Sequence, residues 1–324
     1  MRPRGSGSDP EDEATVADAK AAGVVPCAVL LLAGATRKLG LADEVGRSPL
    51  ELPVSNEQRL LDVWVQRLGE LAAWLGVTPL SVRVLVNDRV PSPEGRVDDG
   101  RVSLKIERDE LELRGTAGLL RDACAGYGDD DWVLVANAGQ LLMGSLDGAV
   151  GALMSVDGAV RVLKHADGTP SSFFLMRCGV LKGVSRQGYI DLKEQFLPKL
   201  AETERVMTVD HPALAVPVRT VNDYVEGLRE YHRAQSGGEL GEPYAEDWRS
   251  TFSVVEPGAE VGAGVRLHDS VVLAGGRVGA KAILVRSVVC AAGMVPQGRM
   301  RVDSVIGTRR SSTARTGGRP HGLE

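Results

Sequence analysis

Short apolar runs alternate with amphipathic segments through the first two thirds of the chain. The run Ala28–Leu32 is continuous, as in a strand buried on both faces, and Val82–Val86 predicts a second strand. Between them, the apolar residues of Leu60–Leu68 recur at the spacing of an amphipathic helix. Strands that alternate with helices are typical of a doubly wound α/β domain, so we expect a parallel or mostly parallel sheet.

Four later segments extend this pattern. We predict strands at Trp132–Val135 and Ser172–Arg177, and helices at Leu192–Leu200 and Asp223–Arg233. One α/β domain is therefore expected at residues 24–235, after a leader at residues 1–23 that is rich in Gly, Ser, Asp, Glu and Ala and predicted to be disordered. The glycines and proline of residues 236–250 indicate a linker.

The pattern changes after residue 251. Small residues and glycines now separate aliphatic residues that recur about every six positions: Val255, Val261, Leu267 and Leu273, then, after a shift in register, Val278, Leu284 and Cys290. This period is typical of a parallel β-helix of hexapeptide repeats, which we place at residues 251–307; a pair of antiparallel hairpins is the alternative. Arginines among Ser, Thr and Gly at residues 308–324 predict a disordered tail.

Composition narrows the classes of function. Hydrophobic residues make up 43% of the chain and charged residues 25%, as in a soluble globular protein. The net charge of -5 leaves no broad basic surface, so we expect no nucleic-acid partner. No apolar run approaches the roughly 20 residues of a membrane span, and the leader lacks a signal-peptide core, so we expect a cytoplasmic protein without membrane contact. Without a CxxC pair, the four cysteines are expected to be buried, reduced thiols: Cys27, Cys124, Cys178 and Cys290.

Five short motifs follow one another along the chain. They are LAGATRKL at Leu32–Leu39, RSPLELPV at Arg47–Val54, GTAG at Gly115–Gly118, YIDLKEQFLPKL at Tyr189–Leu200 and TVNDY at Thr220–Tyr224. In kind and order they resemble the signatures of the sugar-1-phosphate nucleotidyltransferases, or NDP-sugar pyrophosphorylases, over roughly residues 27 to 306. In that family the signatures have the forms LAGGxGxRL, PKPLxPV, GTAG, FDxxxxxLPxL and TxxDY.

The resemblance implies a fold, a reaction and a set of residues. The fold is a Rossmann-like nucleotidyltransferase domain followed by a short left-handed parallel β-helix. In the reaction, an oxygen of a sugar 1-phosphate attacks the α-phosphorus of an NTP and pyrophosphate leaves. The residues that the resemblance assigns to nucleotide binding are Ala33, Gly34, Arg37, Arg47, Gly115, Thr116, Ala117, Gly118 and Asn137.

The chain departs from the family where the metal should bind. Two aspartates hold magnesium in the family, one in an NGD-like strand end and one just before the TxxDY-like motif. In this chain the corresponding segments are Asn137–Gln140 and Ala215–Thr220, and Pro217 stands at the position of the second aspartate. Neither segment therefore contains a carboxylate that could bind magnesium. Ala35 also replaces a glycine of the phosphate loop, and the family's EKP segment keeps at most Lys164.

A displaced metal site is the alternative to a lost one. Asp147 follows the strand and has the better position, whereas Asp129–Asp131 precede the strand and would lie at its other end. Magnesium is thus expected only if the protein is active, and no residue is assigned a catalytic role. Trp64 and Trp74 are expected to pack in the core, and the single histidines are not expected to bind metal: His165, His211, His232 and His268.

Three functions remain open on these residues. The first is a relative of the family that binds a nucleotide or sugar nucleotide with lost or much weakened transfer, a pseudoenzyme, and it is the one we favour. The second is an active pyrophosphorylase with a displaced metal site. The third is a non-catalytic assembly or regulatory subunit that forms homo-oligomers or hetero-oligomers through the β-helix.

Overall fold

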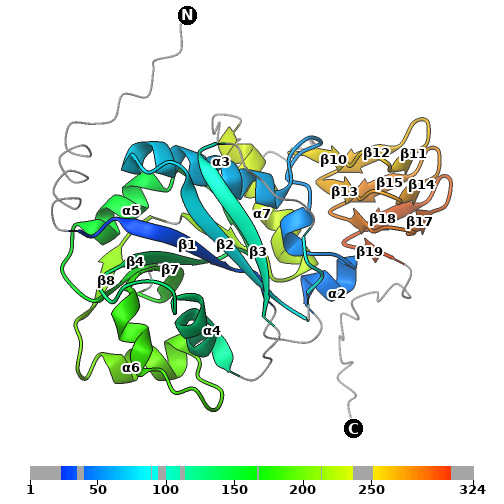
Figure 1. Ribbon diagram of the computed structural model, residues 1–324. Coiled ribbons are helices and arrows are strands. Elements are labelled where there is room, and N and C mark those ends of the chain that lie inside the picture. Colours follow the sequence, from blue (N-terminus) through cyan, green and yellow to red (C-terminus); the bar gives the residue numbers. More distant parts are fainter. Residues whose placement is uncertain are drawn as a thin grey trace, which may run out of the picture. The chain divides into compact units, whose positions relative to one another are not determined.

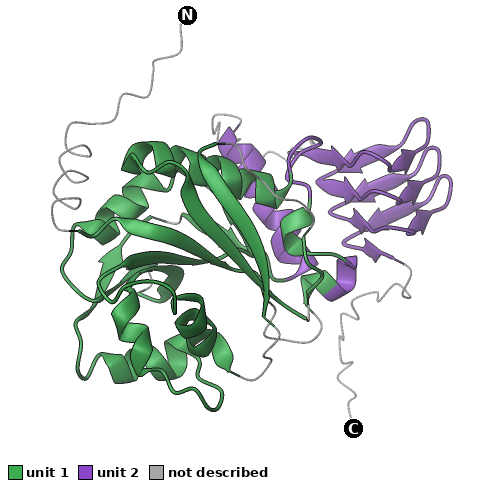
Figure 2. Cartoon of the chain, in the orientation of Figure 1, with its two compact units in different colours: residues 1–42, 47–52, 59–219 green, residues 43–46, 53–58, 220–324 purple. Residues whose placement is uncertain are grey.

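The computed structural model describes residues 23–34, 40–88, 90–93, 100–109, 114–165, 168–212, 214–235 and 251–307 (Figure 1). The chain divides into two compact units (Figure 2). Unit 1 contains residues 1–42, 47–52 and 59–219, and unit 2 contains residues 43–46, 53–58 and 220–324. Residues 220–235, which we expected at the end of the α/β domain, thus fall in the unit that holds the later short strands.

The elements before residue 220 alternate between strands and helices. In chain order they are β1 (Pro26–Leu32), α2 (Leu41–Val45), η1 (Pro49–Glu51), α3 (Leu60–Leu75), β2 (Leu80–Asn87), β3 (Val102–Asp109), α4 (Gly115–Ala123), β4 (Trp132–Asn137), β5 (Gln140–Leu142), α5 (Asp147–Met154), β6 (Val160–Lys164), β7 (Pro170–Arg177), η2 (Cys178–Gly183), η3 (Leu192–Phe196), α6 (Leu197–Leu200), β8 (Val206–Asp210) and β9 (Ala215–Pro217).

The main sheet of unit 1 has seven strands in the order β3-β2-β1-β4-β7-β6-β8. All neighbours are parallel except β7, which runs antiparallel to both β4 and β6. The predicted mostly parallel sheet is therefore confirmed, with one reversed strand. Strands β5 and β9 form a separate antiparallel pair.

Helices cover both faces of this sheet, as Figure 1 shows for α3 and α5 on one side and α4 and α6 on the other. The alternation along β1 explains the two layers: Ala28 and Leu30 belong to the same buried cluster as Leu120 of α4, and the strand residues between them are buried as well. A strand whose two faces are both covered needs this continuous apolar run, so the α/β fold class predicted from it is confirmed.

Unit 2 contains α7 (Val221–Gln235) and a stack of short parallel strands. The strands are β10 (Ser253–Val255), β11 (Glu260–Val261), β12 (Arg266–His268), β13 (Ser270–Val272), β14 (Arg277–Val278), β15 (Ile283–Val285), β16 (Val288–Val289), β17 (Met294–Val295), β18 (Met300–Val302) and β19 (Val305–Ile306). They form three sheets of four, three and three strands, so the parallel β-helix is observed and the hairpin alternative is wrong. The left-handed sense stays a prediction.

One coil of this β-helix takes 17 residues, since Val255 pairs with Val272 and Val272 with Val289. Within a coil, the stacked inward positions advance by six, six and then five residues, from Val255 through Val261 and Leu267 to Val272. The six-residue spacing therefore misplaced two positions by one residue: Val272 and Val289 occupy the columns that we assigned to Leu273 and Cys290.

The corners of the coils explain this shortened step. Each corner has a residue with positive φ that recurs every 17 residues, and the three series are Gly258, Gly275 and Ala292; Gly264, Lys281 and Gly298; and Asp269, Arg286 and Asp303. A left-handed residue turns the chain tightly. In the first two series this residue comes three positions after the inward one, as Gly258 does after Val255, whereas in the third it comes only two positions after, as Asp269 does after Leu267, so that step is one residue shorter.

The cysteines differ in part from the expectation. All four are free thiols, and Cys124, Cys178 and Cys290 are buried, but Cys27 is exposed. Cys27 occupies the second position of β1, before the fully covered part of the strand begins.

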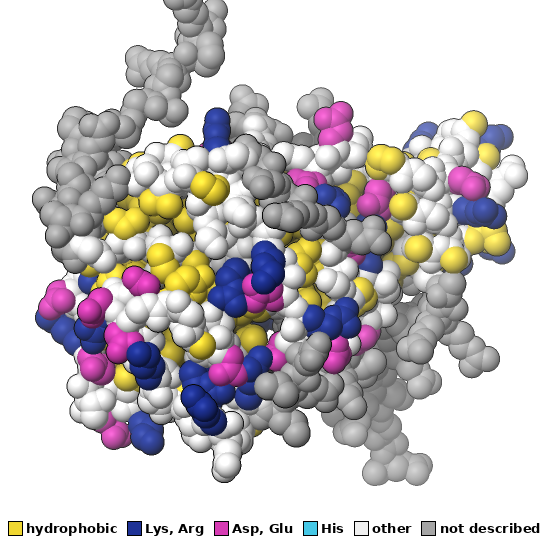
Figure 3. Space-filling model, in the orientation of Figure 1, with side chains coloured by type: hydrophobic (Ala, Val, Ile, Leu, Met, Phe, Trp, Pro, Cys, Tyr) yellow, Lys and Arg dark blue, Asp and Glu magenta, His cyan; other side chains and the backbone are white. Residues whose placement is uncertain are grey.

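Charges are mixed on the surface of unit 1 that Figure 3 displays, where basic and acidic side chains alternate. The expectation of no nucleic-acid partner stays a prediction. Among the described helices, none has the length and apolar character needed to cross a bilayer.

Candidate functional site

The carboxyl ends of the parallel strands meet at one edge of the main sheet. Strands β2 and β3 are added on one side of β1, and β4 lies on its other side. The direction in which the chain adds strands to the sheet therefore reverses between β1 and β4. In open α/β sheets, ligands bind outside the carboxyl ends of the strands at such a switch point. The residues there are Ala33 and Gly34 after β1, and Asn137 and Ala138 at and after the end of β4.

Backbone hydrogen bonds hold these two strand ends side by side. Ala138 N donates to Leu32 O at 2.9 Å, and Ala33 N donates to Leu85 O of β2 at 2.9 Å. Gly34 lies against β2 as well, because a Cβ at this position would be 2.9 Å from the Asn87 carboxamide. The structure thus brings together three of the predicted nucleotide-binding residues, Ala33, Gly34 and Asn137.

The two segments in which the family carries its metal aspartates are neighbours in the structure. Gln140 of β5 pairs with Pro217 of β9, and Val218 N donates to Gly139 O at 2.9 Å. Two segments that are about 80 residues apart along the chain therefore lie side by side. Asn137 stands where the strand ends, and its Oδ1 accepts a hydrogen bond from Gly139 N at 2.8 Å.

Carboxylates do not gather at this place. In the part of the chain that the structure describes, no three His, Cys, Asp or Glu side chains are grouped so that they could hold a metal ion. Asp147 is the first residue of α5, and its Oδ1 is buried without a hydrogen-bond partner in the structure. The three acidic residues before β4 lie at its amino end, as predicted, and contact Lys182, Arg177 and Gly128 N: Asp129, Asp130 and Asp131.

The GTAG turn begins α4 and packs closely against residues 190–192. Gly115 has φ +69°, and a Cβ there would lie 2.3 Å from Ile190 O. Ala117 N donates to Ile190 O at 3.1 Å, and Thr116 Oγ accepts from Leu192 N at 2.8 Å and donates to Asp191 Oδ2 at 3.3 Å. Packing and hydrogen bonding against residues 190–192 thus account for Gly115 and for the polar groups of Thr116 and Ala117.

A basic side chain extends from the same segment. Lys193 Nζ donates to Pro170 O, at 3.2 Å, and lies 5.6 Å from the centre of the Phe174 ring. Burial lowers the pKa of the Lys193 ammonium, and the nearby Arg219 guanidinium lowers this pKa further. The nearby Asp191 carboxylate raises this pKa, so Lys193 has one cation and one anion as charged neighbours.

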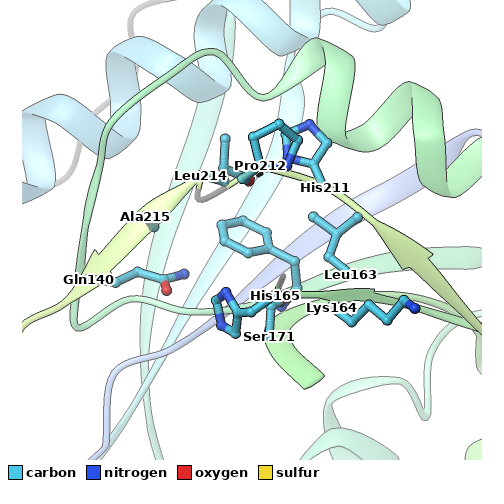
Figure 4. Close-up of a pocket in the computed structure, with 10 residues that line it drawn as sticks. Gln140, Leu163, Lys164, His165, Ser171, His211, Pro212, Leu214 and Ala215 are labelled. Atoms are coloured by element: carbon cyan, nitrogen blue, oxygen red, sulfur yellow. Dashed lines mark hydrogen bonds between the residues drawn. The ribbon is translucent and has the colours of Figure 1, made fainter. Parts of the chain in front are cut away.

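A pocket lies where β6 and β8 end and β7 begins (Figure 4). Its volume is about 20 Å³, enough for one or two small groups and far too small for a nucleotide. Gln140 points into it from β5, and the complete lining is Gln140, Leu163, Lys164, His165, Ser171, Phe173, His211, Pro212, Leu214 and Ala215. His165 and His211, which stand alone in the sequence, share this pocket.

Trp64 of α3 contacts both the end of β4 and a residue that lines the pocket. Its indole Nε1 lies 3.1 Å from Ala138 O and 3.2 Å from Gln140 O, and its ring stacks on Phe173 with 6.1 Å between centroids. Trp64 is fully buried, so the core position that we predicted is confirmed. The sequence did not indicate that this indole also fixes the strand end and the pocket.

Two predicted nucleotide-binding residues remain outside these clusters. Arg37 lies outside the described residues. Arg47 is half-buried just before Ser48, which caps η1. Lys164, the remaining lysine of the EKP-like segment, lines the pocket at the end of β6 and pairs with Asp210 at 3.1 Å.

Comparison with known proteins yields structural similarity alone. No protein-family model and no curated protein matches the sequence. Similar solved structures include a homolog of Mycobacterium tuberculosis rv0371c from Mycobacterium sp. strain JC1, with 17% identity, TM-score 0.43, and coverage of 64% of this chain and 96% of that one. A candidate glucose-1-phosphate thymidylyltransferase from Bacillus anthracis, in complex with sucrose, has 12% identity, TM-score 0.45, and coverage of 66% and 96%.

A third similar structure is HddC from Yersinia pseudotuberculosis, with 13% identity, TM-score 0.41, and coverage of 63% of this chain and 98% of that one. All three TM-scores are below 0.5. The fold class therefore rests on the strand order and the coil period of this chain.

Proposed function

We propose that the protein binds a sugar nucleotide or nucleotide at the carboxyl edge of the main sheet, and that it transfers nucleotidyl groups weakly or not at all. The observation that carries this proposal is the pairing of Gln140 with Pro217. It brings together the two segments in which the enzymes of the resembled family hold magnesium. In this chain the positions of the two aspartates are taken by Asn137–Gln140 and by Pro217, which have no carboxylate.

The loss of charge matters because of the chemistry of transfer. The leaving pyrophosphate and the pentavalent phosphorus concentrate negative charge, which magnesium and cationic side chains stabilise. Lys193, which has the Arg219 guanidinium and the Asp191 carboxylate as charged neighbours, supplies positive charge for binding. Neutral amides bind magnesium poorly, so the site supports binding better than transfer.

The test is a thermal-shift panel of NTPs, NDP-sugars and sugar 1-phosphates, each with and without magnesium, followed by a pyrophosphate-release assay on each ligand that binds. We expect at least one NDP-sugar to raise the Tm equally with and without magnesium. At a hundred times its Kd, a ligand adds about 2.7 kcal/mol to the free energy of unfolding, which raises the Tm by about 4 °C in a chain of this length. Magnesium-dependent turnover would overturn the proposal, and Asp147→Asn would then test the displaced metal site.

A non-catalytic assembly role is the second candidate, and the GTAG turn favours it. The motif argues for a bound nucleotide only if the fold has no other need for the turn, such as close backbone packing. The contacts of Gly115, Thr116 and Ala117 with residues 190–192 supply that need. A thermal-shift panel without any response, together with a stable oligomer in analytical ultracentrifugation, would support this second function.

A further inference from the structure

Two buried cysteines meet between α4 and η2. Cys124 directly follows the last residue of α4, Cys178 is the first residue of η2, and the two elements pack against each other. Both side chains belong to one buried cluster, and Cys124 is 5% exposed and Cys178 3% exposed. A hydrogen bond joins the two thiols. The fold thus places two thiols that are far apart along the chain in direct contact.

The backbone holds both cysteines in place. Cys178 N donates to Asp131 O at 2.8 Å, which ties the start of η2 to the turn before β4. Cys124 N donates to Leu120 O at 2.9 Å, which keeps this residue at the end of α4. Two sulfur atoms in hydrogen-bond contact are near enough to form a disulfide after a small movement of either side chain.

The other two thiols are less well placed for such a bond. The structure describes all four cysteines, and a hydrogen bond between thiols is found for Cys124 with Cys178, whereas Cys27 influences Cys178 at longer range through charge. Cys290 belongs to unit 2, where its Sγ lies 3.8 Å from Glu44 O. Contact therefore selects one pair of the four.

We propose that Cys124 and Cys178 form a reversible intramolecular disulfide when the protein meets a peroxide. One thiolate attacks a peroxide oxygen, the O–O bond breaks, and the leaving hydroxide takes up the proton that this thiol lost, which gives a sulfenic acid and water. The second thiol attacks the sulfenic sulfur, the S–O bond breaks, and the hydroxide leaves with the second proton as water. Two thiols thus lose two electrons to one hydrogen peroxide, and a dithiol such as dithiothreitol reverses the change.

The surroundings of the pair determine which oxidant it meets and how fast it reacts. Hydrogen peroxide is close to water in size, so it suits buried thiols better than a bulky disulfide does. The hydrogen bond with Cys124, and next to it burial, raises the pKa of the Cys178 thiol. Because the thiolate is the reactive form, the pair should oxidise slowly at neutral pH and respond to sustained rather than brief exposure.

The test is a peptide map of the full chain. The protein is incubated with hydrogen peroxide under native conditions, its free thiols are blocked with N-ethylmaleimide in denaturant, and the tryptic peptides are analysed by mass spectrometry without reduction. Trypsin places the four cysteines in different peptides, with Cys124 in residues 122–161 and Cys178 in residues 178–182. We expect these two peptides to be linked, at a mass two hydrogen atoms below their sum, and at least about tenfold more abundant than any other linked pair. Dithiothreitol should separate them.

The bond should also stabilise the protein. It closes a loop of about 50 residues and fixes the end of α4 against η2, so peroxide should raise the Tm by about 3–6 °C. Cys124→Ser and Cys178→Ser should each lose both the linked peptide and the rise in Tm. The matched control is Cys290→Ser, which changes another buried thiol and should keep both.

Three results would overturn the proposal. They are complete alkylation of all four cysteines after peroxide treatment, a link through Cys27 or Cys290 in place of the expected one, and sulfinic acid at Cys124 or Cys178 without a link. The map is read from the unaltered chain, so the decision does not depend on whether a variant folds. Nucleotide binding plays no part in it, so the proposed function stands or falls separately.

Discussion

Two residues of this chain, Trp64 and Gly115, each have two structural tasks. Trp64 fills the core between α3 and the sheet, and its Nε1 also bonds two carbonyl oxygens at the end of β4. Gly115 turns the chain and admits the backbone of Ile190. Neither second task has a signature in the sequence, because each depends on a contact with a residue far along the chain.

Replacing Trp64 tests its hydrogen bonds. Trp64→Phe keeps an aromatic ring but leaves Ala138 O and Gln140 O without this buried donor, so the free energy of unfolding should fall by about 1–3 kcal/mol. Urea unfolding measures this loss. The control is Trp74→Phe, which changes a half-buried indole that packs on Gly151; an equal loss there would contradict a special role for the Trp64 N–H.

Two glycines with positive φ, Gly115 and Gly188, distinguish the cost of an unfavourable backbone conformation from the cost of a steric clash. Gly115→Ala should destabilise the protein by about 2–3 kcal/mol more than Gly188→Ala, since only the first Cβ would collide with backbone atoms. Gly188 also has a positive φ, of +87°, but its Cβ would meet nothing within 4 Å. Thermal unfolding of both variants measures the difference, and equal losses would mean that α4 can move away from Ile190.

The Cys27 thiol offers a prediction about pH. Burial of the thiol, with smaller effects from Cys178 and Asp131, raises its pKa to about 11, although Cys27 as a residue is exposed. Because only the thiolate is alkylated, iodoacetamide should modify Cys27 at pH 8 roughly a hundredfold more slowly than a free thiol. Mass spectrometry of the modified peptide follows the rate, which should keep rising up to about pH 11. Cys27→Ser identifies the site, and a plateau near pH 9 would contradict the raised pKa.

At the scale of elements, periodicity predicted several of the strands and helices that have an apolar face, but it missed β3, α5 and β6, although β6 is almost fully buried. It identified the strand at Ala28–Leu32, the helix that begins at Leu60 and the helix that contains Asp223. It gave no sign of β5, β8 or β9, which are short or half-exposed, so their apolar pattern is too brief to recognise. Gln140 did carry a signal, since it is a polar residue that begins a buried run, but a single amide does not reveal which cavity it faces.

The β-helix shows how a period that holds for only part of each coil gives a wrong register. Six-residue spacing holds on two sides of each coil, and the third side is one residue shorter because its left-handed residue follows the inward residue by two positions instead of three. Asp269, Arg286 and Asp303 take this conformation, and two of them form an ion pair along the stack, with Arg286 Nε 2.6 Å from Asp303 Oδ1. Non-glycine residues at these corners hide the turn from sequence analysis.

Close stacking of the coils leads to a prediction for Gly279. A Cβ at this position would lie 2.5 Å from Gln297 N in the next coil, so Gly279→Ala should lower the free energy of unfolding by about 1–3 kcal/mol. Gly298→Ala is the control, because its Cβ would meet nothing within 4 Å and only its φ of +66° is unfavourable. Differential scanning calorimetry measures both; a smaller effect at Gly279 would mean that the coils separate easily.

At the scale of the whole molecule, unit 2 is built from distant parts of the chain. Tyr224 of α7 donates its hydroxyl to Pro53 O, and His232 Nε2 lies 2.8 Å from Val54 O. His232 also stacks on Phe252, just before the β-helix, at 5.5 Å, and Arg229 pairs with Asp269 at 3.1 Å. Helix α7 is thus held by an early segment on one side and by the first coil on the other.

Removal of the β-helix should therefore loosen α7. In a chain that ends at residue 250, α7 loses the ring of Phe252 and the carboxylate of Asp269, and its amides should exchange at least tenfold faster in hydrogen-exchange mass spectrometry. Peptides from α3 serve as the internal control and should keep their protection. Unchanged protection of α7 would show that the early segment alone holds this helix.

The composition of unit 2 also has a consequence for the order in which the protein can be completed during synthesis. Residues 43–46 and 53–58 leave the ribosome long before the partners at residues 220–307 with which they form a compact unit. At translation rates of roughly 5–20 residues per second, the early segments wait on the order of ten to thirty seconds for α7 and the first coil. During that interval Pro53 and Val54 have carbonyl groups but not yet the Tyr224 and His232 that bond them, so a nascent chain stalled before residue 220 would present this part of its surface to chaperones.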